Sequence, residues 1–482
     1  MSEKDIRKIR FGCSDAHTEG LDYPELLKNG YFDFENVVDK ALHSGTFLFL
    51  GYKGSGKSSL SEHLRLTSND SILVDIQRLT NFSFSSFNKI IKSDTEKEIK
   101  AQETWRWILC VRVLQNLIKD KDARADNEGM VNKAIDLLTQ SGMFPLMTVS
   151  SLVSHSSTTK FKASLNSFGI EHEINSENIP LSISLATNFL KDIIASYKES
   201  HEHFIIIDDI DDILHPNGTQ YNIIAALINE VQDLNRYFKQ KGVPIKILIM
   251  CRTDVFDRLR DPNKNKIKQD SSYCFWWYKE GIDKPNTNPL VKMINIRARL
   301  FFPDIDNIFH EFFPQKYDKT SIYNALLDFT RHTPRDFVEL INFIQKQCED
   351  KVVTLKDIRE GLKEYSMEYF IQEIRDEMTG YIPSDDSELI LSCISSLHNR
   401  EFRFEEIEKI YLGRNVKAKR EDLIEIMQVL YDCSAIGHKY SYKGENRQRV
   451  TFKYRNRNST FNEKEIIFLH KGLWKALNVN YE

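Results

Sequence analysis

The sequence predicts an α/β protein whose core is a parallel sheet flanked by helices. A short apolar run, Thr46–Leu50, stops at a glycine-rich loop, and the residues after that loop, Lys57–Leu66, have helical spacing. A second apolar run, Ser71–Ile76, reads as the next strand, so the order is that of a βαβ unit with two parallel strands. Two further buried strands are expected at Phe204–Ile207 and Ile245–Met250.

Composition bounds the class of protein. The chain has 482 residues, enough for two or three domains, and its 28% charged and 41% hydrophobic residues are ordinary for a soluble globular protein. The formal net charge of −4 excludes a general electrostatic attraction for nucleic acid, so any such binding needs a local basic patch. Seven scattered cysteines without metal-ligand spacing predict reduced thiols in the cytoplasm. No apolar run is long enough to predict a membrane span or a secretion signal.

Between the second and third expected strands lies a long, mostly helical stretch. Glu103–Ile118 and Ser184–Tyr197 have helical patterns, whereas Thr148–Asn178 is polar and serine-rich and predicts a loop or a mobile excursion. We interpret residues 78–202 as a helical insertion in the core domain.

The rest of the chain divides by pattern. Asn222–Lys239 has helical periodicity, and from Pro289 to Tyr381 the pattern is almost entirely helical. Ile382–Glu388, with a proline and two aspartates, predicts a boundary, and the last hundred residues mix helices with two or three strands. The predicted domains are residues 1–288, 289–381 and 382–482.

The glycine-rich loop carries the most specific motif. Gly51–Ser58 matches GxxxxGK[ST] between a strand and a helix, the context in which such a loop wraps phosphates with its backbone N–H groups. Lys57 is expected to bridge the β- and γ-phosphates, and the Ser58 hydroxyl to bind Mg²⁺. The residues predicted to bind the nucleotide here are Gly51, Lys53, Gly54, Ser55, Gly56, Lys57, Ser58 and Ser59.

Carboxylates follow the strand Phe204–Ile207. Asp208 and Asp209 come directly after it, and the carboxyl end of a parallel strand is the edge of the sheet where nucleotides bind. We expect Asp208 to hold Mg²⁺ and Asp209 to polarise the attacking water. Asp211 and Asp212 continue the acidic run, either as supporting groups or as the solvated start of a helix.

Two arginines are further candidates. Arg252 follows the strand Ile245–Met250 and either stabilises phosphate charge or is a surface residue at a strand end. Arg335 follows Thr333 and Pro334, which suit a helix start, and it either reaches the nucleotide or belongs to a plain first turn. The predicted catalytic residues are therefore Asp209, Lys57 and Arg252.

This combination of motifs resembles the STAND and AAA-like ATPases, in particular bacterial orphan P-loop ATPases related to the KAP and origin-recognition types. The following short stretches also fit that group: Phe11–Ala16, Tyr31-Phe32, Arg299-Leu300 and Leu469–Leu473. The resemblance implies an α/β P-loop NTPase core with a helical insertion, a helical lid (289–381) and a C-terminal winged-helix-like α+β domain (382–482). The long insertion departs from the family pattern.

The resemblance also implies roles for single residues. Tyr31 and Phe32 would lie near the adenine, unless they are core aromatics of the first helix. Arg297 and Arg299 are candidates for a trans-acting arginine finger by location alone, so homo-oligomerisation stays open. By the same analogy, the protein would be a nucleotide-driven switch that acts with a partner protein, in bacterial anti-phage defence.

The C-terminal hundred residues contain a basic stretch, Lys439–Arg457. Alternation in Arg449–Tyr454 predicts a β-hairpin with basic and aromatic residues exposed on it, which could be a wing that contacts DNA or RNA phosphates. A solvated hairpin, or one that docks on an acidic protein, explains the same pattern. The seven basic residues are Lys439, Lys443, Arg447, Arg449, Lys453, Arg455 and Arg457.

The sequence thus predicts an ATPase that uses ATP and Mg²⁺. GTP is disfavoured because Asn263–Lys266 lacks the aspartate of a guanine-reading NKxD motif. Three functions are weighed: a regulatory ATPase that switches a partner, a nucleic-acid-dependent ATPase of the initiator or loader type, and a kinase of a small substrate. The kinase ranks last because half of the chain would have no role in it.

Overall fold

The computed structural model describes residues 3–80, 82–91, 97–145, 147–158, 179–210, 219–279, 287–441 and 448–479. The chain divides into two compact units, which we describe separately. Unit 1 comprises residues 1–34, 54–56 and 276–482, and unit 2 comprises 35–53 and 57–275. None of the helices in the described ranges is long and apolar enough to cross a membrane.

Unit 2 is built on a five-stranded sheet with the strand order β2-β5-β6-β1-β7, in which every neighbouring pair is parallel. The strands are β1 (Leu48–Gly51), β2 (Ile72–Arg78), β5 (Glu202–Asp208), β6 (Ile245–Arg252) and β7 (Ser272–Cys274). All four residues of β1, and all of β5 after Glu202, are buried, as expected of central strands covered on both faces. The parallel order brings the carboxyl ends of all five strands to one edge.

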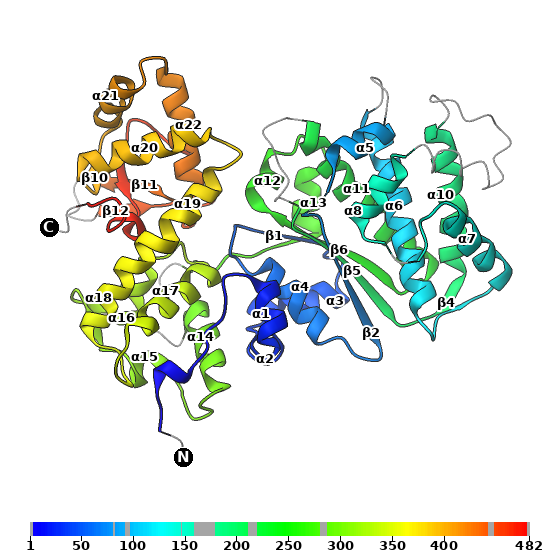
Figure 1. Cartoon of the computed structure of the whole chain (residues 1–482), viewed down its shortest axis with the longest axis horizontal. Helices are drawn as coiled ribbons and strands as arrows, with labels where there is room; N and C mark the ends of the chain where they lie inside the picture. The colour runs from blue at the N-terminus through cyan, green and yellow to red at the C-terminus, as the bar shows by residue number, and fades with distance from the viewer. Residues whose placement is uncertain are drawn as a thin grey trace. The chain divides into compact units, whose positions relative to one another are not determined.

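Helices cover both faces of this sheet. Helix α4 (Lys57–Leu66) packs against β1, β2, β5 and β6, and α11 (Thr219–Lys241) packs against β6. Figure 1 shows α4 on one side of the sheet and α11 on the other. Unit 2 also contains α3 (Val37–His43), α12 (Thr253–Arg258) and α13 (Lys264–Asp270). The predicted parallel core flanked by helices is confirmed.

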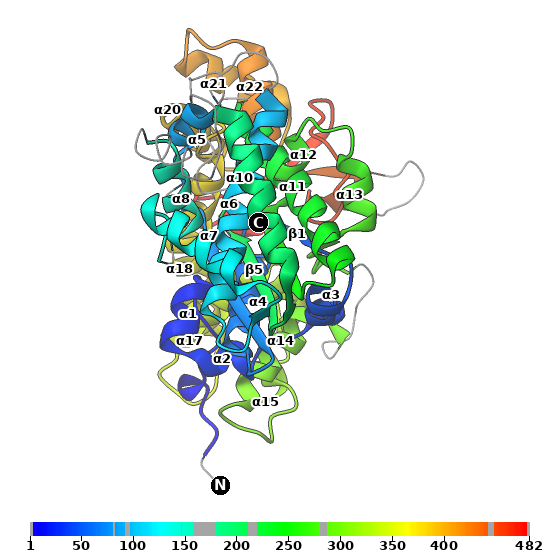
Figure 2. The same cartoon turned by 90° about the vertical axis from the view of Figure 1, so that its right-hand side faces the viewer.

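The insertion between β2 and β5 is helical, as predicted. Its longest helix, α6, packs against α10 and α11, and the three run side by side in Figure 2. Its elements are α5 (Phe84–Ile91), α6 (Lys97–Lys119), β3 (Arg124–Ala125), α7 (Glu128–Gln140), α8 (Val149–Ser156), α10 (Ile179–Ser196) and β4 (Tyr197–Glu199). The loop predicted at Thr148–Asn178 is wrong at its start, because α8 forms there; residues 159–178 lie outside the described ranges.

Helix α8 forms in a serine-rich stretch because its N-terminus is capped and one of its faces is apolar. Thr148 caps the helix by accepting a hydrogen bond from the backbone N–H of Ser151. Val149, Leu152 and Val153 are spaced for one helical face and are buried. The abundance of serine hid this apolar spacing from the sequence reading.

Unit 1 begins with α1 (Ala16–Asp22) and α2 (Pro24–Lys28) and continues after the sheet with a mainly helical segment, as predicted. This segment contains α14 (Pro289–Arg299), α15 (Ile308–Glu311), β8 (Lys316–Tyr317), β9 (Thr320–Ser321), α16 (Ile322–Leu327), α17 (Pro334–Gln347), α18 (Leu355–Glu364) and α19 (Ile371–Met378). One continuous apolar core joins it to the C-terminal elements. Helix α20 (Ser384–Leu397) starts within the expected boundary at Ile382–Glu388.

The C-terminal part of unit 1 is winged-helix-like. Helix α20 is followed by a short strand, two helices, a hairpin and a last strand. These are β10 (Glu401–Phe402), α21 (Phe404–Arg414), α22 (Arg420–Asp432), β11 (Ile436–Ser441), β12 (Gln448–Thr451) and β13 (Ile466–Leu469). The strands form an antiparallel sheet of order β10-β13-β11-β12. The predicted P-loop core, insertion, lid and winged-helix-like domain are therefore the fold.

Candidate functional site

The P-loop lies between β1 and α4 and has the geometry of a phosphate cradle. Gly54 and Gly56 have φ values of +74° and +98°, in the left-handed region that favours glycine. Lys57 is the first residue of α4, and its Nζ donates to the carbonyl oxygens of Gly51 (3.0 Å) and Tyr52 (3.2 Å). The ammonium group is thus held close against the loop, at the start of a helix whose dipole favours an anion.

Ser55 adds an unsatisfied donor to this loop. Its side chain is buried, and its hydroxyl has no hydrogen-bond partner among the described residues. Buried hydroxyls normally have partners, because an unpaired one costs free energy. A phosphate oxygen would accept from this hydroxyl, so the loop fits the phosphate group that its sequence motif predicts.

The carboxylate of Asp208 lies at the end of β5 and is only 3% exposed. It accepts hydrogen bonds from the Ser61 hydroxyl of α4 (2.9 Å) and from the backbone N–H of Asp209 (2.9 Å). The P-loop helix and the acidic strand end are therefore joined through Ser61, which lies one turn after Ser58. A buried carboxylate at this position has the oxygen ligand chemistry that Mg²⁺ prefers.

Asp209 adopts a strained backbone conformation. Its φ is 57°, a region that non-glycine residues rarely occupy and that is found at functional sites. One of its carboxylate oxygens, Oδ2, lies 3.8 Å from Nε of Arg78, at the end of the neighbouring strand β2. Arg78 also pairs with Glu62, a residue of α4 that is only 1% exposed and also bonds Arg65. Asp209 is thus tied to an ion-pair network that ends in the P-loop helix. Asp211 and Asp212 lie outside the described residues.

Arg252 ends β6, at the same edge of the sheet. Its guanidinium group donates to both carboxylate oxygens of Asp254, at 3.0 and 2.8 Å. This bidentate pair fixes the direction of the side chain and offsets its charge locally. The structure therefore places Arg252 at the expected strand end and gives it a carboxylate partner that the sequence reading did not foresee.

The start of the lid helix α17 contacts the middle of the P-loop. Thr333 caps the helix by accepting from the backbone N–H of Asp336 (3.2 Å), and the backbone N–H of Arg335 donates to the carbonyl of Gly54 (3.2 Å). A Cβ built on Gly54 would lie 2.8 Å from the Cβ of Arg335. This position therefore requires glycine for two reasons, its positive φ and the close approach of α17. The indole of Trp277 also donates to the loop, at the carbonyl of Ser55 (2.8 Å).

A buried ion pair supports this helix start. Arg331 bonds both carboxylate oxygens of Asp336, each at 2.8 Å, and also pairs with Glu377. Burial alone would raise the pKa of Asp336, but the charge and hydrogen bonds of Arg331 lower it. The Arg335 side chain reaches Glu373, with 3.7 Å between Nη1 and Oε2.

Arg297 was a candidate for a trans-acting arginine finger because of its location in the sequence, and the structure shows that this prediction is wrong. Its side chain is buried, and its guanidinium group bonds both carboxylate oxygens of Glu19 and the carbonyl of Phe11. Arg299 donates to the carbonyls of Ile305 and Asp306. A buried and ion-paired guanidinium cannot reach a second copy of the chain, so Arg297 has a structural role.

The aromatic residues of the first segment pack near Trp277. The ring centroid of Phe32 lies 6.2 Å from that of Trp277, and Phe34 stacks on Trp277 at 4.7 Å. Phe32 is partly buried against the core of unit 1. This is the core-aromatic environment that the sequence reading offered as the alternative to an adenine contact.

The basic hairpin forms, but the expected exposure of its residues is wrong in large part. Phe452 and Tyr454 are buried. Lys439, Lys453 and Arg455 pair with carboxylates at 2.6, 3.4 and 3.4 Å. Arg457 lies over the ring of Trp276, Arg449 is exposed, and Tyr442, Lys443 and Arg447 lie outside the described residues.

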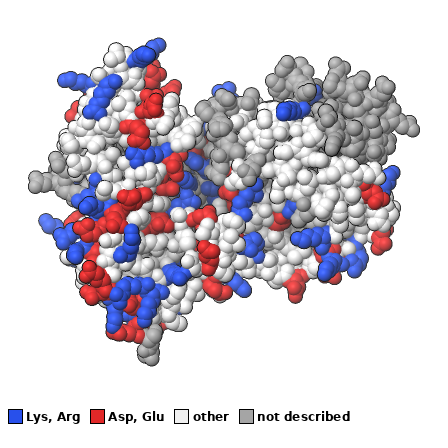
Figure 3. All heavy atoms as spheres, viewed as in Figure 1, with Lys and Arg blue, Asp and Glu red and all other residues white. Residues whose placement is uncertain are grey.

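The helix before this hairpin is acidic on its solvent side. Glu421, Asp422 and Glu425 are its most exposed residues. Figure 3 shows acidic and basic side chains interspersed on this face of unit 1. Carboxylates repel a phosphate backbone, so neither α22 nor the paired cations of the hairpin provide the basic surface predicted for nucleic acid.

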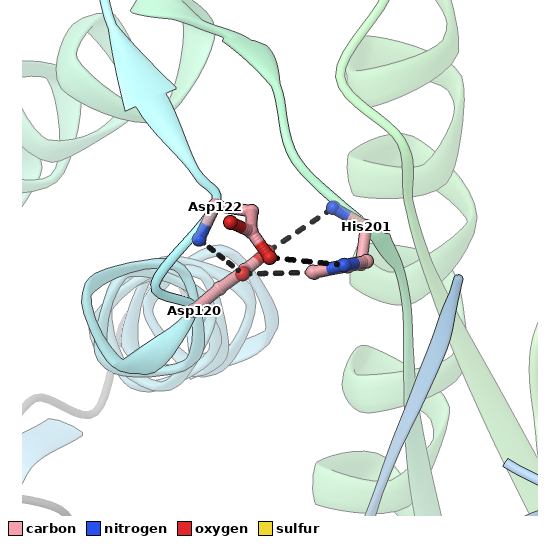
Figure 4. A group of neighbouring side chains, drawn as sticks. All are labelled: Asp120, Asp122 and His201. Atoms are coloured by element: carbon pink, nitrogen blue, oxygen red, sulfur yellow. Dashed lines mark hydrogen bonds and ion pairs between the residues drawn. The ribbon is translucent and has the colours of Figure 1, made fainter. Parts of the chain in front are cut away.

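A second polar cluster joins the end of α6 to the start of β5. The carboxylate of Asp120 accepts from the backbone N–H groups of Asp122 and His201 and from the ring of His201 (Figure 4), at 2.8 to 3.1 Å. It also accepts from the ring of His203, at 3.1 Å. Asp120, Asp122 and His201 have the donor atoms of a metal site. The oxygens of Asp120 are already used by these four donors, so the cluster is a structural junction.

The sequence reading missed Ser61, Glu62, Arg78 and Trp277. Arg78 lies two residues beyond the predicted strand Ser71–Ile76, whereas the observed strand β2 extends to it and so brings it to the same sheet edge as Asp208. Ser61 follows Lys57 by four residues, which places both on one helical face. Nothing local in the sequence identifies Trp277, whose contact depends on the packing of unit 1.

Comparisons with known proteins add limited information. Residues 288–372 match a family model described as the FunZ-associated C-terminal helical domain. The chain is similar to the Orc1 protein of Aeropyrum pernix, solved in complex with DNA, at 13% identity, a TM-score of 0.38 and coverage of 92% of this chain and 89% of that one. It is also similar to Cdc6p of Pyrobaculum aerophilum at 13% identity, a TM-score of 0.31 and the same coverage. We base no functional conclusion on likeness at this level. No curated protein matches the chain.

Proposed function

We propose that the protein is a Mg²⁺-dependent ATPase that acts as a nucleotide-driven conformational switch. The observation that carries this proposal is the P-loop between β1 and α4. The loop contains the buried hydroxyl of Ser55 and holds the ammonium group of Lys57. Ser61, on the helix that follows, donates a hydrogen bond to the buried carboxylate of Asp208. A kinase of a small substrate is not favoured by any feature of the described residues.

We propose the following roles for the residues of the site. Gly51, Lys53, Gly54, Ser55, Gly56, Lys57, Ser58 and Ser59 form the loop and helix start that bind the phosphates. Ser58 and Asp208 hold Mg²⁺, which when bound offsets negative charge on the phosphate oxygens. Asp209 orients the attacking water and accepts its proton, and Arg252 stabilises phosphate charge. Arg335 belongs to the helix that closes on the loop.

The switch is supported by the contact of α17 with the P-loop. The Arg335 N–H on the Gly54 carbonyl and the Trp277 indole on the Ser55 carbonyl connect loop conformation to the core of unit 1. A change in the loop on binding or hydrolysis of ATP would alter these two hydrogen bonds. We propose that a protein partner reads this change, with homo-oligomerisation open and, on the family resemblance, bacterial anti-phage defence as the setting.

The alternative, a nucleic-acid-dependent ATPase with a basic wing, has lost most of its support. Three of the seven cations are paired within the chain, and the helix before the hairpin is acidic. DNA stimulation is therefore expected to be absent. The activity assay tests this expectation directly, because turnover is measured with and without DNA.

The test is ATP turnover by the purified protein, with and without single- or double-stranded DNA, in low and moderate salt. Lys57→Ala is expected to abolish turnover with the fold intact, as judged by circular dichroism. Asp209→Asn is expected to keep ATP binding and to lower turnover by about 10²–10⁴. Full activity of Lys57→Ala would refute the proposal, and DNA stimulation that fades with salt would replace the partner-protein reading with the nucleic-acid one.

A further inference from the structure

Unit 1 contains a cavity of about 480 Å³, a volume in the range of small-molecule sites. One wall comes from the helical lid segment, at the turn between β8 and β9 and at the end of α16. The other wall comes from the C-terminal part, at Arg400, Lys471 and Trp474. The cavity therefore lies where two segments far apart in the sequence meet within one unit.

The base of the cavity is apolar and fixed. Ala325, Phe329 and Trp474 are buried lining residues. The indole N–H of Trp474 donates to the carbonyl of Leu469 (2.9 Å), and its ring meets that of Phe468 edge-on, with 6.1 Å between the centroids. An apolar surface that is already held in place loses little conformational freedom when a ligand binds.

The mouth of the cavity is charged. The lining residues Lys319, Arg400 and Lys471 are exposed or half-buried, and Asp318 is the one carboxylate among the described lining residues. Three cations and one carboxylate give the lining a formal charge of +2, which attracts an anion. The Asp318 carboxylate repels a doubly charged phosphate more strongly than a singly charged carboxylate. The charges therefore favour an organic acid.

Arg400 has donors open to such a ligand. Its guanidinium carbon lies 5.7 Å from the centroid of the Trp474 ring, and within the described ranges its side chain makes no hydrogen bond or ion pair. Arg331, Arg455 and Lys471 of the same unit are, by contrast, paired with carboxylates. An unpaired, half-buried guanidinium beside an apolar ring offers planar, bidentate binding to a carboxylate.

Lys319 supplies a second open cation from a tight turn. Asp318 and Lys319 form the two-residue turn between β8 and β9, with φ values of 45° and 64°. Such turns favour Asn-Gly, because both residues occupy the left-handed region. Lys319 is exposed, and its ammonium group pairs with no carboxylate in the part of the chain that the structure describes. The turn thus presents a cation at the mouth, at a position where glycine would suit the backbone better.

We propose that this cavity binds an organic carboxylate that has a large apolar group. The carboxylate lies between Arg400 and Lys319, and the apolar group lies on Phe329 and Trp474. A free small acid and the last residue of a peptide both have this chemistry. The bound ligand contacts the lid segment and the C-terminal part at once, so it fastens them to each other. None of these residues has a proposed role in ATP hydrolysis, so the site is independent of that activity.

The binding test is a calorimetric titration of the full chain with N-acetyl-L-phenylalanine, which joins an aromatic ring to one carboxylate. N-acetyl-L-phenylalaninamide lacks the charge, acetate lacks the ring, and inorganic phosphate replaces the carboxylate by a phosphate. Sodium chloride keeps the ionic strength the same in all titrations. One site is expected for the acid, with the other three probes bound at least about tenfold more weakly, the factor of one hydrogen bond to a charged group.

Arg400→Gln should weaken binding of the acid about tenfold. Since the Arg400 side chain has no polar partner within the described ranges, the variant should keep the circular dichroism spectrum of the parent. Arg403→Gln is the matched control, because Arg403 is exposed, lies in the same stretch of chain and does not line the cavity. It should bind the acid as the parent does.

Lys319 allows a test that damage to the fold cannot imitate. Lys319→Gly removes the cation and suits the positive φ, so binding should weaken several-fold while the thermal unfolding temperature stays the same or rises. Lys319→Arg keeps the charge and should keep the affinity.

Equal binding of the amide, tighter binding of phosphate, no loss in Arg400→Gln, or an equal loss in Arg403→Gln would overturn the site. Unchanged binding in Lys319→Gly would overturn the arrangement with two cations. The source of the ligand is tested with N-acetyl-Gly-Gly-Phe, which carries the same end group on a longer chain. Binding at least as tight as that of N-acetyl-L-phenylalanine assigns the site to the end of a peptide, and weaker binding assigns it to free acids. None of these measurements requires ATP turnover, so an inactive ATPase would leave them interpretable.

Discussion

At the scale of single residues, Ser61 joins the helix after the P-loop to the carboxylate proposed to hold Mg²⁺. Its hydroxyl is buried and lies 2.9 Å from Oδ2 of Asp208. Groups that orient a metal ligand through a hydrogen bond commonly change metal affinity 10- to 100-fold when removed. The geometry therefore assigns Ser61 a positioning role.

Ser61→Ala is expected to raise the Mg²⁺ concentration needed for half-maximal ATP turnover by about tenfold. The free energy of unfolding should fall by about 1–2 kcal/mol, because Asp208 stays buried and loses a donor. Mg²⁺ titrations of turnover and urea unfolding measure the two effects. Ser61→Thr retains the hydroxyl and should restore the Mg²⁺ requirement. An unchanged requirement in the alanine variant would show that Asp208 needs no such support.

Residue types in a motif were predictable, but their partners were not. The phosphate loop and the two aspartates after β5 follow from patterns that are local in sequence. The partners of Arg252, Arg297 and Arg455 are carboxylates chosen by tertiary packing, which a one-dimensional pattern does not contain. For this reason the sequence did not reveal the acids of the same chain with which these three arginines pair.

At the scale of elements, helix α17 depends on its cap for the contact with the P-loop. Thr333 accepts from the N–H of Asp336, and the same first turn supplies the N–H of Arg335 that reaches Gly54. Loss of a threonine cap costs about 1 kcal/mol and frays the first turn. The helix after it, α18, has an equivalent cap, Thr354, and within the described part of the chain no hydrogen bond joins the start of that helix to the loop.

Thr333→Ala and Thr354→Ala should each lower the free energy of unfolding by about 1 kcal/mol. Only Thr333→Ala should also weaken ATP binding, by about fivefold, the factor that corresponds to about 1 kcal/mol. Chemical denaturation and a fluorescent-nucleotide titration provide the two measurements. If both variants bound ATP as the parent does, α17 would not be coupled to the loop.

Elements were predictable where the apolar period was regular. The predicted helix at Lys57–Leu66 has the bounds of α4, and β5 and β6 contain the predicted strands. Helix α8 was read as a loop because serines fill its exposed positions and weaken the pattern. The hairpin was predicted by alternation, but the sheet order β10-β13-β11-β12 is set by tertiary packing, and Phe452 and Tyr454, which follow β12, are buried.

At the scale of the whole molecule, three histidines among the described residues of unit 1 have buried ring nitrogens and are held neutral. Burial lowers the pKa of His332 to about 3, of His470 to about 3 and of His438 to about 4, from 6.5 in each case. Nearby arginines, Arg455 for His332 and Arg331 for His470, lower it further. Each histidine takes up a proton on unfolding below pH 6.5 that the folded chain does not bind.

The contribution of these histidines to stability is therefore complete above pH 6.5 and is lost as the pH drops towards the folded-state pKa values, about 4 for His438 and about 3 for the other two. Burial raises the pKa of Glu230 and of Glu339 to about 7, so these carboxyls bind protons in the folded chain and oppose two of the three histidines. The net slope is therefore about 1.4 kcal/mol per pH unit between about pH 4.5 and 6. Urea unfolding monitored between pH 7.5 and 5 should show this loss.

His438→Gln tests the cause, because Nε2 of His438 accepts from the backbone N–H of Asn462 and the glutamine oxygen can accept there without titrating. That variant should lose about 1.4 kcal/mol per pH unit of the slope. His310→Gln, at an exposed histidine, should retain the full slope. A slope that His438→Gln left unchanged would mean that this imidazole is protonated in the folded chain, and the buried sheet of the winged-helix-like domain would then have to hold a charge.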